Sequence, residues 1–225
     1  MSGRIFEVSG YEYRQDDFGS CHRCINREDY MKTVSYYRDH IFIDGEIEAI
    51  EDYDFGEENL RQRFENDRLR MENVYNILEF WGLELTSTSS LLDIGCGYGA
   101  FLNLFHERTG GRAYGIDISS KSIPLAKLLN PEIEVASFDT TSMEEIIIDK
   151  EITTIVAFDI IEHLMDVEVF LQTLYSVCPW GLDLIVELPV IHPAFGYDEL
   201  KDYRYLYPTR HLHLYTPKGI IHLFK

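Results

Sequence analysis

The fold of this chain is decided by the stretch Leu91-Leu92-Asp93-Ile94-Gly95-Cys96-Gly97-Tyr98-Gly99-Ala100. It predicts a buried strand, then a glycine-rich turn, then a helix that begins around Phe101. Glycine suits such a turn because the backbone must bend sharply and approach a ligand closely, which a Cβ atom would prevent. A turn of this kind between a strand and a helix indicates a cofactor site.

More apolar runs of strand length follow the turn, at intervals that leave room for a helix between them. With the first strand, they occupy residues 91–94, 113–116, 133–136, 152–158 and 182–188. This spacing is typical of parallel strands joined by crossover helices. We therefore predict an α/β fold with a doubly wound, mostly parallel, Rossmann-like sheet in a domain over residues 89–225.

Residues 1–88 are Tyr-rich and charged, and we expect a helical and irregular N-terminal extension there. Apolar residues between Leu60 and Leu78 recur at helical spacing, which predicts an amphipathic helix that ends at Gly82 and covers the sheet or a pocket. Cys21 and Cys24 have the spacing of half a zinc site, but the sequence holds no second pair, so we assign no metal there.

Composition limits the classes of partner. The chain has 39 Asp and Glu residues against 20 Lys and Arg, a formal net charge of −19. This charge disfavours nucleic acid and anionic membranes, because phosphate binders need a clustered basic surface. No apolar run reaches the ~18 residues of a spanning helix, and residues 1–10 do not resemble a signal peptide. We expect a cytoplasmic protein with no nucleic-acid or membrane partner.

Two cofactors fit the glycine-rich turn. Gly95, Gly97 and Ala100 satisfy the dinucleotide fingerprint, and Asp117 follows roughly 20 residues later at a strand end, where a carboxylate can accept hydrogen bonds from ribose hydroxyls. This spacing does not separate NAD from S-adenosylmethionine. Asp93 favours the second, because a carboxylate beside the turn repels a pyrophosphate but attracts an ammonium and a sulfonium.

From about residue 90 to residue 224 the chain resembles the class I S-adenosylmethionine-dependent methyltransferases. The resemblance is carried by Leu-Leu-Asp-Ile-Gly-Cys-Gly-Tyr-Gly at 91–99, Tyr-Gly-Ile-Asp-Ile-Ser at 114–119, Phe-Asp-Ile-Ile-Glu-His-Leu-Met-Asp at 158–166 and Arg-His-Leu-His-Leu-Tyr-Thr-Pro at 210–217. The last two segments are similar to the branch that methylates small molecules, including polysaccharide sugars and quinone precursors.

The resemblance implies which residues hold the cofactor, S-adenosyl-L-methionine. The turn contacts methionine and ribose, the 117–118 segment meets the ribose hydroxyls, Asp139 meets the adenine amino group, and the end of the fourth strand closes the site. The implied cofactor-binding residues are Asp93, Gly95, Cys96, Gly97, Gly99, Asp117, Ile118, Asp139, Phe158 and Asp159.

In this family the sheet usually continues beyond its fifth strand through a helix into an antiparallel hairpin. Here the sequence ends at Lys225, within the pattern of that helix. We therefore expect a sheet that is truncated at five strands or covered by the N-terminal extension. An uncovered edge favours a homo-oligomer.

Three histidines, His163, His192 and His211, are candidates for catalysis or substrate contact. Methyl transfer to a hydroxyl requires an acceptor held about 3 Å from the methyl group and a group that removes its proton. His163 belongs to an Asp159-x-x-Glu162-His163 set, which can supply a base, a helix cap or, as in some quinone O-methyltransferases, metal ligands. We assign no metal. His192 and His211 lie in segments beyond strand ends, where open α/β sheets bind ligands.

The leading interpretation is a methyltransferase that acts on a small-molecule hydroxyl, a sugar of a glycan or of a nucleotide-sugar precursor, in polysaccharide biosynthesis. The Tyr-rich loop at 197–207, with Arg204 and Arg210, suits sugar rings and phosphates or carboxylates. Two alternatives stay open. An NAD-dependent oxidoreductase would use the same turn, and a catalytically inactive binding subunit would explain the short C-terminus.

Overall fold

The computed structural model describes residues 4–39, 41–43, 46–48, 57–138, 142–178, 181–192 and 209–225. The predicted Asp139 and the 197–207 loop with Arg204 lie outside the described residues. Contacts divide the chain into two compact units. We call residues 35–157 and 173–185 the sheet unit, and residues 1–34, 158–172 and 186–225 the three-segment unit.

A five-stranded sheet has the order β10-β9-β6-β7-β8. Its strands are β6 (Ser90–Ile94), β7 (Arg112–Asp117), β8 (Glu134–Ser137), β9 (Thr154–Phe158) and β10 (Asp183–Glu187). β6 pairs in parallel with β7 and with β9, and β7 pairs in parallel with β8. This is a doubly wound order, and each strand starts and ends within a residue or two of its predicted position. The predicted α/β, Rossmann-like fold is confirmed.

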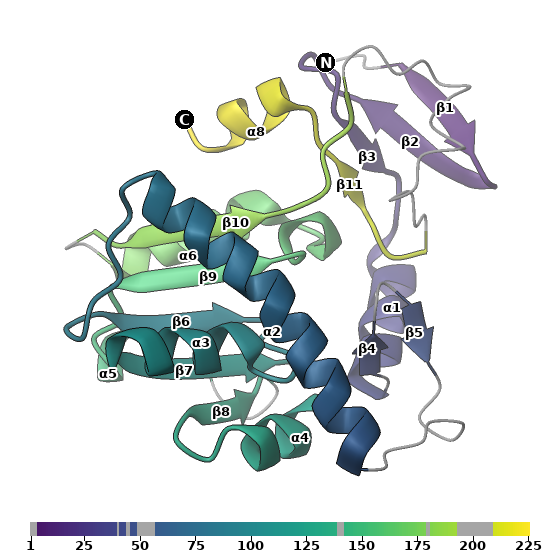
Figure 1. The fold of residues 1–225 in the computed structure, drawn as a ribbon. Helices are drawn as coiled ribbons and strands as arrows, with labels where there is room; N and C mark the ends of the chain where they lie inside the picture. Colours follow the sequence, from purple (N-terminus) through teal and green to yellow (C-terminus); the bar gives the residue numbers. More distant parts are fainter. Residues whose placement is uncertain are drawn as a thin grey trace. The chain divides into compact units, whose positions relative to one another are not determined.

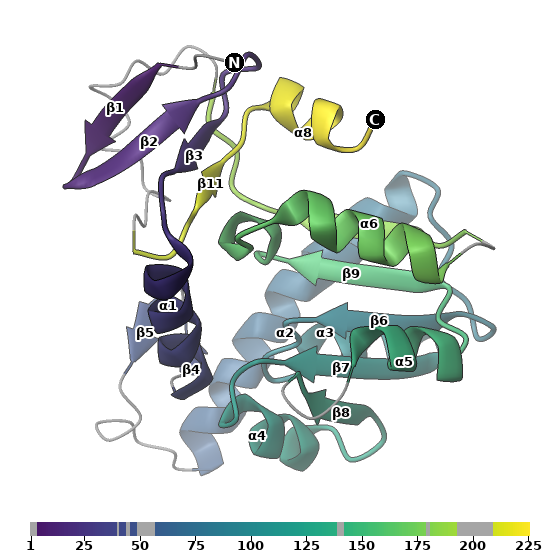
Figure 2. The same cartoon turned by 180° about the vertical axis from the view of Figure 1, so that it is seen from behind.

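Helices cover both faces of the sheet within the sheet unit. α2 (Glu57–Phe80) and α3 (Ala100–Thr109) lie on one face and α5 (Met143–Asp149) on the other, while α4 (Ser122–Leu129) packs beside β8 (Figures 1 and 2). The predicted amphipathic α2 buries Leu60, Phe64, Met71, Tyr75 and Leu78. Gly82 follows it with a φ of +81°, a left-handed residue that ends a helix.

Hydrogen bonds fix the helices near the glycine-rich turn. Arg68 of α2 donates to the side chain of Asn103 over 2.9 Å and to that of Glu107 over 2.6 Å, both on α3. The hydroxyl of Ser119, just before α4, accepts from the N–H groups of Lys121 and Ser122, each over 3.3 Å. These bonds fix α3, which follows β6 in the chain, and the start of α4, which follows β7.

The three-segment unit contains an antiparallel sheet that the sequence did not predict. Its order is β1-β2-β3-β11, formed by β1 (Ile5–Val8), β2 (Tyr11–Gln15), β3 (Cys21–Arg23) and β11 (His213–Leu214). Its small core consists of Val8, Tyr13, Cys21, Ile191 and Leu214. The expected irregular extension is therefore a strand meander whose fourth strand comes from the far end of the chain.

Six further elements complete the described part of the chain. They are α1 (Arg27–Asp39), β4 (Ile41–Ile43), β5 (Glu46–Glu48), the 3-10 helix η2 (Ile161–His163), α6 (Val167–Val177) and α8 (Pro217–Leu223). Thr216 caps α8 by accepting from the Gly219 N–H over 3.1 Å, as the Thr216-Pro217 pair predicts. In the part of the chain that the structure describes, no helix combines the length and the apolar character needed to cross a membrane.

Candidate active site

The glycine-rich turn after β6 is held by the neighbouring strand. The N–H groups of Gly95 and Cys96 both donate to the Ile116 carbonyl, over 2.7 and 3.1 Å. Gly95, Gly97 and Gly99 have φ angles of +79°, +52° and +79°, a region open to glycine at little cost. A Cβ atom at Gly97 would meet no heavy atom within 4 Å. The turn therefore leaves open space where glycine was predicted to admit a ligand.

Asp117, at the end of β7, binds this turn directly. Its Oδ2 accepts from the Gly97 N–H over 2.8 Å and its Oδ1 accepts from the Ser119 N–H over 2.7 Å. Burial raises the pKa of Asp117, and these two N–H groups oppose the rise. Each carboxylate oxygen keeps a second lone pair, so Asp117 can still accept hydrogen bonds from hydroxyl donors such as those of a ribose.

Asp93, near the end of β6, is a second carboxylate beside the turn. Its side chain is buried, and burial, followed by the charge of Asp117, raises its pKa to about 8. A cation placed near both groups would relieve the cost of ionising them. The pair therefore fits a ligand that carries an ammonium and a sulfonium and opposes a pyrophosphate, as the sequence predicts.

Cys96 and Ile118 also lie in the predicted cofactor segments. The thiol of Cys96 packs against β7, because its Sγ lies 2.7 Å from where a Cβ of Gly115 would be. Burial raises its pKa well above the ordinary thiol value, so the thiol stays protonated and only the backbone of Cys96 belongs to the turn. Ile118 is half-buried between Asp117 and Ser119.

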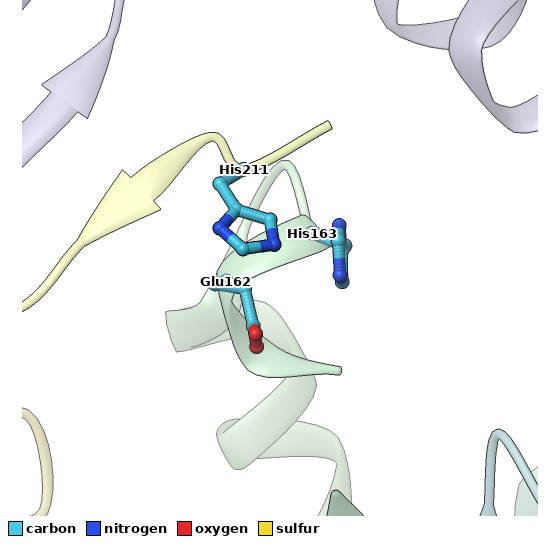
Figure 3. A group of neighbouring side chains, drawn as sticks. All are labelled: Glu162, His163 and His211. Carbon is cyan, nitrogen blue, oxygen red and sulfur yellow. The ribbon is translucent and has the colours of Figure 1, made fainter. Parts of the chain in front are cut away.

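In the three-segment unit, the structure brings together Glu162, His163 and His211. The first two lie on η2 and the third precedes β11 (Figure 3). Their potential ligand atoms all lie within 4.8 Å of one another, and the two imidazole rings meet edge-on with centroids 4.8 Å apart. The backbone closes this arrangement, since the Leu212 N–H donates to the Glu162 carbonyl over 2.7 Å.

The protonation of His163 follows from its partner. Its Nδ1 lies 3.0 Å from the Arg210 carbonyl, which can only accept, so Nδ1 carries the hydrogen and Nε2 carries the lone pair. Burial lowers the pKa of His163 to about 4, so the ring is neutral at pH 7. A neutral ring with a fixed tautomer can accept a proton or bind a metal through Nε2.

Glu162 is an unusual carboxyl group, because its side chain is fully buried. Neither of its oxygens has a hydrogen-bond partner on another described residue. Burial raises its pKa to about 8, its own N–H opposes that rise, and the charges of Asp159 and Glu187 add to it. A buried, unpaired acid of this kind is costly, and a bound cation or a donor group would offset the cost.

The other predicted residues occupy separate positions in the three-segment unit. His192 is exposed and is not part of the Glu162, His163 and His211 group. Asp159, just after Phe158 at the end of β9, has a φ of +54°, and its N–H donates to the Glu187 carbonyl over 2.8 Å. The sequence grouped Asp159 with Glu162 and His163, whereas the third member of the observed group is His211.

Comparison with known proteins decides the family. A family model described as a methyltransferase domain matches residues 61–225. The chain belongs to this methyltransferase family. Membership confirms the prediction of a methyltransferase domain and, with it, of S-adenosyl-L-methionine as the cofactor of the family.

Two curated relatives are ubiquinone biosynthesis O-methyltransferases. The one from Rhodopseudomonas palustris (strain BisB5) is 34% identical over 108 residues, which is 47% of this chain and 42% of that protein. The one from Bradyrhizobium diazoefficiens is 35% identical over 100 residues, which is 44% of this chain and 39% of that protein. The chain thus spans less than half the length of these relatives. Their names refer to ubiquinone biosynthesis, not to the polysaccharide biosynthesis expected from the sequence.

Solved structures of other methyltransferases have a similar fold. Geranyl diphosphate C-methyltransferase from Streptomyces coelicolor A3(2) has a TM-score of 0.55 at 13% identity, covering 89% of this chain and 79% of that one. Magnesium protoporphyrin IX methyltransferase from Synechocystis PCC 6803, with bound S-adenosylhomocysteine, has a TM-score of 0.50 at 18% identity, covering 76% of each chain.

Proposed function

We propose that this chain transfers the methyl group of S-adenosyl-L-methionine to a hydroxyl group of a small molecule. The observation that carries the proposal is the turn at Gly97, where φ is positive and an added Cβ atom would meet open space. The Gly97 N–H donates to Asp117 Oδ2 over 2.8 Å. A turn without a side chain at Gly97, flanked by the buried carboxyl group of Asp93 and the half-buried one of Asp117, fits a cationic nucleoside cofactor. The family match over residues 61–225 supports the same reaction.

Each group of the turn has a role in this proposal. When bound, S-adenosyl-L-methionine supplies an electrophilic methyl group. Asp117 holds the ribose hydroxyls through the lone pairs that Gly97 and Ser119 leave unused, and Asp93 faces the positive charge. Because these groups are fixed before the cofactor arrives, little ordering is needed on binding.

Proton removal from the acceptor is assigned to His163. Its Nε2 carries the lone pair, and the bond from Nδ1 to the Arg210 carbonyl keeps the ring in one tautomer. His211 contacts the acceptor or His163, and His192 contacts the acceptor from its exposed position. A hydroxyl acceptor is favoured because the curated relatives are named O-methyltransferases. The two candidate acceptor classes are sugars and quinone precursors, whose hydroxyl groups are phenolic.

The experiment has two stages. Titration calorimetry with S-adenosylhomocysteine and with NAD tests the cofactor, and methyl-labelled S-adenosylmethionine then tests transfer to a panel of phenols and sugar nucleotides. We expect S-adenosylhomocysteine to bind and a labelled ether product to form. Binding of NAD alone would favour the oxidoreductase alternative, and cofactor binding without product from any acceptor would favour the inactive binding subunit.

A second role for the Glu162, His163 and His211 group is proposed from the unpaired carboxylate of Glu162. Two imidazoles and one carboxylate, with ligand atoms within 4.8 Å, match the donor set that proteins offer to Zn²⁺, Mn²⁺ or Fe²⁺. A cation held there would pair the Glu162 charge and lower the pKa of a bound hydroxyl. This proposal departs from the sequence-based assignment of no metal.

Equilibrium dialysis of the whole chain against Zn²⁺, Mn²⁺ and Mg²⁺ tests this role. We expect Glu162→Gln to weaken binding at least about tenfold, whereas Glu168→Gln, an exposed acid on α6, should not change it. Equal metal binding by both variants would show that Glu162 is not a metal ligand, and no metal binding by the wild-type chain would leave His163 and His211 as proton acceptors and substrate contacts only.

A further inference from the structure

Asn130 lies at the C-terminal end of α4 and reaches the glycine-rich turn. Its side chain is buried, and its Nδ2 donates to the Tyr98 carbonyl over 2.7 Å and to the Ala126 carbonyl over 3.0 Å. Both partners are carbonyls, which only accept, so the amide must turn its NH₂ group toward them. Asn130 belongs to none of the motifs that mark the cofactor site in the sequence.

The peptide between Tyr98 and Gly99 is consequently held at both of its polar ends. Asn130 binds the carbonyl, and the Gly99 N–H donates to the Cys96 carbonyl over 2.7 Å. Rotation of this peptide plane would break both bonds. It would also move Gly99 from its φ of +79°, and the first turn of α3 depends on that residue because the Asn103 N–H donates to its carbonyl over 2.9 Å.

Packing matches the two positions to each other. A Cβ atom at Gly99 would lie 3.0 Å from Asn130 Nδ2 and 3.0 Å from Ile133 Cδ1, so glycine makes room for the amide. The other polar atom of this amide, Asn130 Oδ1, is buried without a hydrogen-bond partner among the described residues. An unpaired buried acceptor lowers stability. Stability of α4 alone therefore does not explain the residue, whereas the bond that it donates to the Tyr98 carbonyl does.

We propose that Asn130 is a positioning residue for the cofactor, which holds the Tyr98–Gly99 peptide in the orientation that receives S-adenosyl-L-methionine. This inference rests on the proposed function. The turn is fixed from two sides, since Asp117 binds the Gly97 N–H at the end of β7 and Asn130 binds the Tyr98 carbonyl at the end of α4. A turn fixed in advance binds more tightly because less order must be created on binding.

The test compares Asn130→Ala and Asn130→Ser with Ser90→Ala. Ser90 is a matched control, because its buried hydroxyl also donates to a carbonyl, that of Lys150 over 2.9 Å, but at the opposite end of β6. Asn130→Ala should weaken S-adenosylhomocysteine binding about fivefold to tenfold. Asn130→Ser, which keeps one donor, should fall between it and wild type, and Ser90→Ala should stay within about twofold of wild type.

A second readout examines the turn without cofactor. Hydrogen exchange of the 95–103 segment should be faster in Asn130→Ala than in wild type and unchanged in Ser90→Ala. Wild-type affinity in Asn130→Ala, or an equal loss in Ser90→Ala, would overturn the inference. If Asn130→Ala does not fold, Asn130→Ser decides the same comparison.

The two readouts also separate this inference from the proposed function. Failure of the wild-type chain to bind S-adenosylhomocysteine would count against the proposed function. The exchange measurement would still decide the role of Asn130, because it needs no cofactor. Unchanged exchange of the turn in the Asn130 variants would show that the amide does not hold the peptide.

Discussion

The backbone N–H of Gly97 donates to Asp117 Oδ2 over 2.8 Å and thereby joins the end of β7 to the turn after β6. One carboxylate thus orders the glycine-rich turn and also presents its remaining lone pairs to a ligand. The two effects share one side chain, so a change at Asp117 acts on both the shape and the chemistry of the turn.

Asp117→Ala should weaken S-adenosylhomocysteine binding by about 1–3 kcal/mol, because the ribose hydroxyls and the Gly97 N–H would both lose their acceptor. Titration calorimetry measures the change. Asp149→Ala removes an exposed acid at the end of α5 and should bind normally. Normal binding by Asp117→Ala would mean that the cofactor lies elsewhere.

Gly97→Val should abolish cofactor binding, because the added side chain would occupy the open space beside the turn. Gly82→Val is a matched control, since Gly82 also has a positive φ, +81° against +52°, and a Cβ atom at either glycine meets nothing within 4 Å. Both variants should lose similar free energy of unfolding from backbone strain. Only Gly97→Val should lose binding in calorimetry, and intact binding would show that the space does not hold the ligand.

The contribution of Asp93 to the free energy of unfolding of the cofactor-free protein should fall as the pH rises from about 4 to about 8. Asp93 has a folded-state pKa of about 8, above the ~3.9 of an unfolded aspartate. Between these values the folded state keeps a proton that the unfolded state releases, so raising the pH favours unfolding by at most about 1.4 kcal/mol per pH unit.

Urea denaturation of wild type and Asp93→Asn at pH 5, 6.5 and 8 measures this dependence. The difference between the two proteins should grow in favour of the variant as the pH rises. A constant difference across these pH values would show that Asp93 ionises normally in the folded state.

His163→Ala should reduce turnover by about 10²–10⁴-fold, the usual contribution of a general base, and leave S-adenosylhomocysteine affinity unchanged. Steady-state rates with the identified acceptor and calorimetry measure the two quantities. The control is His222→Ala, an exposed histidine on α8, which should keep its turnover. If His163→Ala were as active as wild type, the histidine would serve only to join η2 to the Arg210 backbone.

The main sheet and its glycine-rich turn could be predicted from the sequence because their signals are local. β6 and β9 are buried on both faces and read as continuous apolar runs, Leu91 and Ile155 among them. The turn between β6 and α3 shows its three glycines in a single short stretch. Such features need no information from distant parts of the chain.

The antiparallel sheet and the Glu162, His163 and His211 group could not be predicted in this way. β1 (IFEV), β2 (YEYRQ) and β3 (CHR) are only four, five and three residues long, and their charged and polar side chains leave no apolar run of strand length. His211 joins Glu162 only because Leu212 pairs with both η2 and Arg23 through backbone hydrogen bonds. Asn130 gave no signal either, since an asparagine after a helix is usually read as a helix end.

The pairing of β3 with β11 makes synthesis order matter. His22 and His213, which face each other across these strands with their Nδ1 atoms 2.9 Å apart, are separated by 191 residues. During synthesis the edge of β3 therefore has no strand to pair with until nearly the whole chain has been made. Contacts between residues so far apart in the sequence form slowly. A fragment that starts at residue 89 would keep β11 but lack β3, so the edge of β11 that pairs with β3 here would have no partner.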